Sequence, residues 1–82
     1  MKLTYLSGDC PEGPCPTIYG NDRGEFVFQG TGPVTEAEGA EPPPSHEARV
    51  ALPSAVIVEW VASSLSLPTE WVAARLVARA AG

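Results

Sequence analysis

The sequence predicts an α+β fold in which a small antiparallel sheet of three to four strands precedes two C-terminal helices packed on one of its faces. Short strand-like runs separated by turn residues fill residues 1–30, a stretch without periodicity follows over 31–47, and helical spacing of apolar residues dominates 48–82. A run of strands followed by a run of helices is typical of the α+β class. With 82 residues, the chain has room for one small domain with one core.

The first strand is predicted over residues 2–6, where polar and apolar side chains alternate. Prolines and glycines in residues 7–16 predict a segment without regular structure. Residues 17–19 and 25–29 predict a hairpin whose turn residues tolerate left-handed or tight-turn conformations. The predicted hairpin tip consists of Asn21, Asp22, Arg23 and Gly24.

Residues 31–47 form a predicted acidic, Pro-rich flexible loop. Val34 is its one large apolar side chain, so the segment buries too little surface to offset the entropy lost on ordering. Pro42–Pro44 favours the polyproline II conformation, and we interpret this triplet as a spacer rather than a ligand for an SH3-type domain. A short strand is predicted to follow over residues 48–52.

Pro53 precedes the first predicted helix, residues 54–65, because the first helical position tolerates a missing N–H group. An apolar stripe runs along this helix, with Trp60 at its margin. The stripe consists of Ile57, Val58, Val61 and Leu65. We expect this stripe to face the sheet, and we place Phe28 and Val61 in the core.

The second helix is predicted over residues 68–81, with Pro68 in its first turn and good helix formers throughout. Its predicted buried face consists of Val72, Ala73, Leu76, Val77 and Ala80. Trp71 lies opposite that face, and Arg75 follows one turn later, so the guanidinium can stack on the indole and hold it at the surface. The alternative is that Trp71 docks into a partner or into the sheet.

Charge is unevenly distributed along the chain, which carries a net charge of −5. Eight of the ten acidic residues lie within residues 1–48, so this half attracts either the other half or a basic partner. An acidic balance disfavours direct binding of nucleic acid. No apolar run approaches the roughly 18 residues of a membrane span, and no signal peptide is recognised, so we expect a cytoplasmic protein without a membrane partner.

Few residues carry the chemistry of catalysis. The sequence has no nucleophile elbow, phosphate-binding loop or dinucleotide-binding fingerprint, so we predict that the protein is not an enzyme and needs no cofactor. A weak alternative is a zinc-binding or thiol-redox module centred on Cys10 and Cys15, with His46 as a third ligand. A disulfide between Cys10 and Cys15 would close the short loop and fix the turn, but in a reducing cytoplasm we expect two free thiols.

Residues 15–24 read Cys-Pro-Thr-Ile-Tyr-Gly-Asn-Asp-Arg-Gly, followed by Phe26-Val27-Phe28-Gln29-Gly30. This segment resembles a family of small uncharacterised actinobacterial proteins with the signature Cys-Pro-Thr-x-Tyr-x-x-Asp-Arg-Gly, and the resemblance covers residues 10–30 and 48–55. It implies an association with helix-turn-helix regulators and supplies no catalytic residues.

The predicted function is therefore a non-catalytic protein-interaction module, with an accessory role to a bacterial transcriptional regulator as the expectation from that resemblance. The partner is another protein or a second copy in a homodimer, because the two helices offer more apolar surface than so small a sheet covers. The predicted partner-binding residues are Trp60, Trp71, Arg75 and Arg79.

Overall fold

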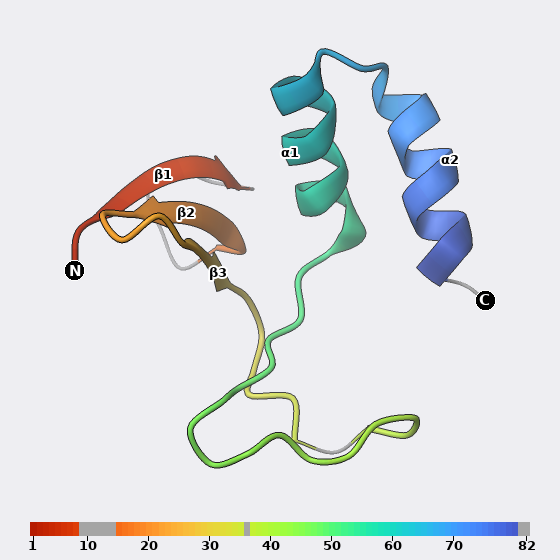
Figure 1. Cartoon of the computed structure of the whole chain (residues 1–82). Coiled ribbons are helices and arrows are strands. Elements are labelled where there is room, and N and C mark those ends of the chain that lie inside the picture. The colour runs from red at the N-terminus through yellow and green to blue at the C-terminus, as the bar shows by residue number, and fades with distance from the viewer. Residues whose placement is uncertain (9–14, 36, 81–82) are drawn as a thin grey trace.

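A computed structural model of the chain describes residues 1–8, 15–35 and 37–80. Three strands are followed by two helices, which confirms the predicted α+β class (Figure 1). The elements are β1 (Leu3–Gly8), β2 (Thr17–Asn21), β3 (Phe26–Gln29), α1 (Ser54–Leu65) and α2 (Thr69–Ala80).

The sheet is antiparallel throughout, in the order β1-β2-β3. β1 continues to Gly8, so the prediction that regular structure stops at residue 6 is wrong. The register between β1 and β2 shifts between Tyr5 and Ser7, which pair with the consecutive residues Tyr19 and Ile18, as in a β-bulge.

The tip of the β2–β3 hairpin is built around one side chain. The Oδ1 atom of Asn21 accepts hydrogen bonds from the backbone N–H groups of Arg23 and Glu25, each at 2.9 Å. Gly24 has a φ of 78°, a conformation in which a side chain would be strained. The predicted tip residues therefore act as turn formers, as their types indicate.

Helix α1 is buried on two sides, which differs from the single predicted stripe. Val58 and Ala62 form a cluster with Val72 of α2. Val56, which is 1% exposed, lies one turn before Trp60 on the side that meets the sheet. The predicted stripe is wrong for Leu65, which is 63% exposed. Because α1 is apolar nearly all round, periodicity alone does not identify its covered sides.

The two helices form a hairpin closed by a left-handed residue. Ser66 has φ 55° and ψ 45°, and its backbone N–H bonds to the carbonyl of Ala62. Helix α1 contacts β1, whereas α2 packs against α1 (Figure 1). The second helix is thus attached to the sheet through the first.

Residues 31–51 form a projection that we call the acidic arm. At its base, the backbone N–H groups of Thr31 and Ala51 bond to each other's carbonyl oxygens at 2.8 and 2.7 Å. Gly30 permits this close approach, because an added Cβ would lie 2.1 Å from the carbonyl oxygen of Ala51. The predicted strand over residues 48–52 is therefore wrong: this segment contributes an isolated bridge between Thr31 and Ala51.

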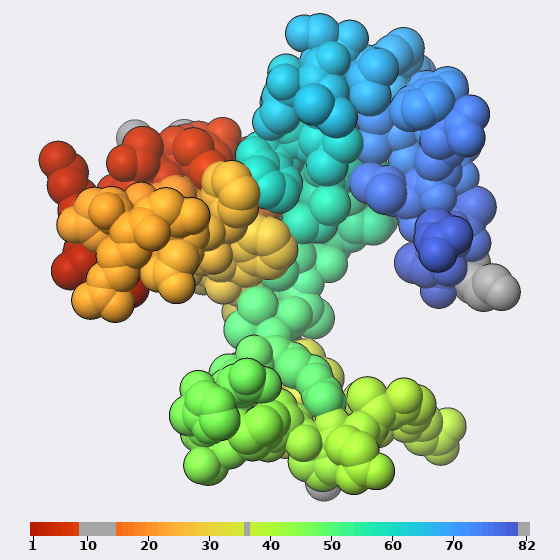
Figure 2. All heavy atoms as spheres, viewed as in Figure 1, coloured from red at the N-terminus to blue at the C-terminus, as the bar shows by residue number. Residues whose placement is uncertain are grey.

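Figure 2 shows the acidic arm as a separate lobe, joined to the rest of the molecule by a narrow neck. Four glutamates and one arginine of the sequence fall within it, so the arm carries a negative charge. Three of the arm's described residues are partly buried, and the others are exposed. The three are Val34, Pro43 and Arg49. The arm therefore adds exposed charged surface to the molecule rather than core.

Candidate protein-interaction surface

Trp60, the first predicted partner-binding residue, is used largely within the chain. Its ring meets those of Phe26 and Phe28 in edge-to-face geometry, with centroids 5.2 and 6.1 Å away and interplanar angles of 71° and 82°. We call these three residues the aromatic cluster. Its rings fasten the β2–β3 hairpin onto α1.

The aromatic cluster lies at the surface rather than in the core. Phe26 is 63% exposed and Phe28 is 43% exposed, so the prediction of Phe28 as a core residue is wrong. Val61, the other predicted core residue, is only partly buried and packs at the margin of the α1–α2 cluster. Two side chains of β2 are fully buried, Thr17 at 1% and Ile18 at 0% exposure, and Ile18 pairs with Phe28 across the strands.

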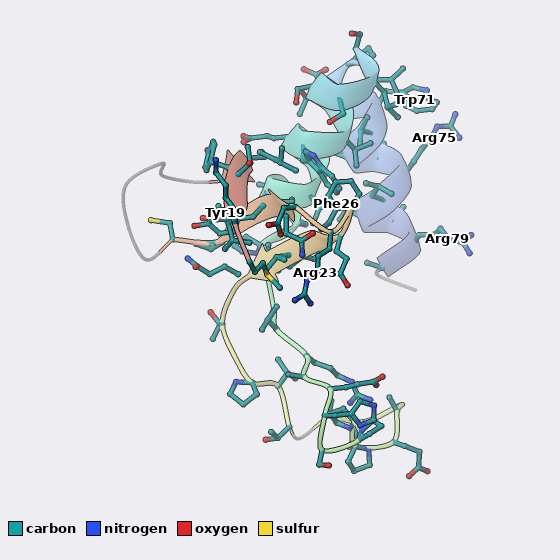
Figure 3. All side chains as sticks on the ribbon, turned by 60° about the vertical axis from the view of Figure 1, so that its left-hand side comes forward. Tyr19, Arg23, Phe26, Trp71, Arg75 and Arg79 are labelled. Atoms are coloured by element: carbon teal, nitrogen blue, oxygen red, sulfur yellow. The ribbon has the colours of Figure 1, made fainter. Side chains whose placement is uncertain are left out.

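Trp71, Arg75 and Arg79 lie on the side of α2 that points away from the sheet (Figure 3). The guanidinium carbon of Arg75 lies 4.1 Å from the centroid of the Trp71 ring, which confirms the predicted stack. Trp71 nevertheless remains 47% exposed. This stack holds the indole in a fixed orientation at the surface and leaves about half of it accessible to a partner.

A shallow depression runs beside these side chains, and its lining consists of Ala74, Arg75, Ala78 and Arg79. Together with Trp71, these residues make up what we call the α2 outer face. Neither arginine forms an ion pair in the described part of the chain, where the recorded ion pair joins His46 to Glu47. The α2 outer face therefore combines a half-exposed indole with two exposed cations that form no ion pair with the described carboxylates.

A second feature lies between the two helices. A cavity of about 220 Å³ opens between the first half of α1 and the second half of α2. We call it the interhelical groove, and its lining consists of Ser54, Ile57, Val58, Leu76, Val77 and Ala80. The sequence places Leu76 and Val77 on the buried face of α2, but they are 39% and 42% exposed. That face is covered at Val72 and open near the C-terminal end of the helix.

A third depression, of about 210 Å³, lies on α1 and is lined by Trp60, Val61, Ser64 and Leu65. It extends the apolar surface from the aromatic cluster toward the end of α1. Sequence reasoning missed Leu65, Leu76 and Val77 as surface residues. The sequence did contain a signal for their exposure: the two helices have more apolar residues than three short strands can cover.

The state of Cys15 differs from the expected free thiol. Cys15 is disulfide-bonded, so the expectation of free thiols is wrong for this residue, while Cys10 lies outside the described residues. The backbone carbonyl of Cys15 accepts hydrogen bonds from the Thr17 hydroxyl at 2.7 Å and from the Gln29 side-chain amide at 2.9 Å. These bonds tie the start of β2 to the end of β3.

His46 lies in the acidic arm, where its Nε2 atom is 3.8 Å from a carboxylate oxygen of Glu47 and its side chain is 78% exposed. Within residues 1–8, 15–35 and 37–80, no three His, Cys, Asp or Glu side chains gather closely enough to hold a metal ion. A sulfur in a disulfide is also not a thiolate ligand. The zinc alternative therefore has no ligand group in this part of the molecule.

Comparison of the chain with family models, curated proteins and solved structures found no match. No helix in the described ranges has both the length and the apolar character needed to cross a membrane. The features of the molecular surface are therefore what indicates a function. Its features are the α2 outer face, the interhelical groove and the acidic arm.

Proposed function

We propose that the protein is a non-catalytic protein-interaction module that binds its partner through the helical hairpin. The observation that carries this proposal is the Trp71–Arg75 stack, which presents a half-exposed indole and a cation on a side of α2 that the described residues leave open. Tryptophan and arginine are the residue types most enriched among the dominant contacts of protein interfaces. A pre-oriented stack also lowers the entropy lost on binding.

The adjoining apolar surface supports the same function. Leu76 and Val77 expose about two-fifths of their area at the interhelical groove, on the same helix as the α2 outer face. An apolar groove beside exposed cations is suited to an amphipathic partner segment that carries carboxylates. Two arginines on a protein of net charge −5 are too few for a nucleic-acid surface, which supports a protein partner.

The resemblance to the actinobacterial family extends the proposal to the partner's identity, namely a bacterial transcriptional regulator, with the protein as its accessory. The same proposal places the protein in the cytoplasm. The disulfide at Cys15 is more typical of an oxidising compartment, so redox state belongs among the conditions varied in any binding assay.

Affinity capture followed by direct titration tests the proposal. The immobilised chain is used to capture proteins from a lysate, and the identified partner is then titrated against the purified wild type, Trp71→Ala and Leu3→Ala. Leu3 is 44% exposed in β1 and serves as the matched control. We expect Trp71→Ala to weaken binding about tenfold or more and Leu3→Ala to leave it unchanged. Equal affinities for the two variants, or no direct binder, would contradict the proposal.

A further inference from the structure

The acidic arm presents a proline triplet between carboxylates. Pro42–Pro44 lies between Glu41 and Glu47, and both glutamates are exposed. The backbone N–H of Glu47 bonds to the carbonyl of Pro44 at 2.9 Å, so the chain turns after the triplet and keeps Glu47 close to it. A segment of successive prolines is already extended and loses little entropy on binding.

Arg49, the arginine of the arm, forms no ion pair with the described carboxylates of the arm. The guanidinium of Arg49 donates a hydrogen bond to the backbone carbonyl of Glu41 rather than to a side chain. Glu38 and Glu41 have no ion-pair partner in the described part of the chain. The arm therefore presents carboxylates that are open to cations from outside it.

The α2 outer face is complementary to this segment in both chemistry and dimensions. Pro-rich segments dock on exposed aromatic rings, and Trp71 offers one. Arg75 and Arg79 are one turn apart, roughly 6 Å along the helix, and three polyproline residues extend about 9 Å. A triplet seated on the indole therefore brings its flanking carboxylates within the range of the two guanidinium groups.

We propose that the α2 outer face of one copy binds the acidic arm of a second copy, with Pro42–Pro44 against Trp71 and the arm's glutamates against Arg75 and Arg79. The inference rests on the proposed function and names the occupant of its surface. Among the described residues of one chain, no ion pair joins the arm to α2. In Figure 2 the arm projects away from the body, where it is accessible to another molecule.

A two-fold arrangement uses this contact twice. Each arm reaches the α2 outer face of the other copy, as expected for a symmetric dimer whose two contacts are equivalent. The contact is largely electrostatic, so it weakens as salt screens the charges. Doubling the contact compensates for the small area of each one.

A charge exchange measured by sedimentation equilibrium tests the inference. The face variant is Arg75→Glu/Arg79→Glu, and the arm variant is Glu38→Lys/Glu41→Lys/Glu47→Lys. We expect the wild type to dimerise at low salt, with a dissociation constant that rises with salt concentration. Each variant alone should dimerise at least about tenfold more weakly, because like charges then meet at both contacts.

A mixture of the two variants should recover the dimer, since every face then meets an arm of opposite charge. Recovery also shows that both variants are folded. The matched control, Lys2→Glu/Arg23→Glu, changes the net charge as much as the face variant does, but at exposed sites outside α2. It should dimerise like the wild type, apart from the added general repulsion that it shares with the face variant, since both proteins carry four more negative charges than the wild type.

Three results would overturn the inference: a monomer at every concentration, a dimer insensitive to both exchanges, or a mixture that fails to associate. A monomer whose identified partner is still lost in the face variant means that another protein occupies the surface. That result would retain the proposed function and overturn the second copy as occupant. A monomer that also binds no partner would contradict both the proposed function and the inference of a second copy.

Discussion

The two helices have the same length, 12 residues each, but they serve different purposes. Helix α1 buries Val56, Val58 and Ala62 and contacts both the sheet and α2. Helix α2 buries Val72 and packs against α1. The difference shows that α1 holds the fold together, whereas most of the residues of α2 are exposed.

The largest expected effect concerns the side of the fold that α1 covers. Ile18 is 0% exposed, and replacing it with alanine should lower the free energy of unfolding by about 2–5 kcal/mol, because the substitution leaves a cavity. A domain of this size gains only about 3–5 kcal/mol from its core, so this variant should be largely unfolded. Circular dichroism and urea titration measure the loss. A stable Ile18→Ala protein would show that the sheet does not depend on this residue.

A direct comparison of the helices uses one substitution at two positions. Val56→Ala in α1 should lower the free energy of unfolding by roughly 2 kcal/mol, since two buried methyl groups are lost along with their packing. Val77→Ala in α2 should cost less than about 1 kcal/mol, because Val77 is already 42% exposed. Urea titrations of the two variants check this difference. Equal losses would remove the distinction between the helices.

The two tryptophans, one on each helix, provide a second comparison of α1 with α2. Trp60→Leu removes two edge-to-face contacts, each worth about 0.5–1.5 kcal/mol beyond area, and should lower the free energy of unfolding accordingly. Trp71→Leu removes an exposed cation–π contact worth about 0.5–1 kcal/mol. Thermal melts of both variants provide the test. A larger loss for Trp71→Leu than for Trp60→Leu would mean that Trp71 serves mainly the fold.

The smallest effect is expected at the hairpin tip, far from α2. Asn21→Ala removes the side-chain oxygen that accepts from the Arg23 and Glu25 backbone N–H groups, and should cost about 1 kcal/mol. Asp22→Ala, at the neighbouring exposed position, should be nearly neutral and serves as the control. If the two variants have the same melting temperature, the Asn21 side chain does not stabilise the turn, and backbone geometry alone holds it.

Local features of the fold were predictable where the chain itself determines them. The bounds of α1 follow from Pro53 and helical spacing, the β2–β3 turn follows from Asn21 and Gly24, and the Trp71–Arg75 stack follows from a four-residue interval. Each of these features depends on neighbours within one turn of helix or hairpin. The sequence therefore sufficed for them.

Features that depend on the assembly of distant elements were not predictable. The exposure of Phe28 and Leu65 depends on how the sheet and the helices cover one another. When a helix is apolar on all sides, its sequence does not indicate which side will be covered. The segment 48–52 has strand-like composition but meets only Thr31, so it forms a bridge instead of a fourth strand. For the site, Trp71, Arg75 and Arg79 of the α2 outer face were named from the sequence, whereas Ala74, Ala78 and the interhelical groove were not.

The emission of Trp71 tests most directly whether the α2 outer face is a docking surface for the acidic arm. Trp60→Phe keeps an aromatic ring in the cluster and leaves Trp71 as the sole tryptophan of the chain. At low salt, raising the protein concentration from micromolar to millimolar should shift its emission to shorter wavelength as Pro42–Pro44 of a second copy excludes water from the indole. The same series with the arm variant should show no shift. An emission maximum that stays constant with concentration, or that shifts equally in both proteins, would contradict the account.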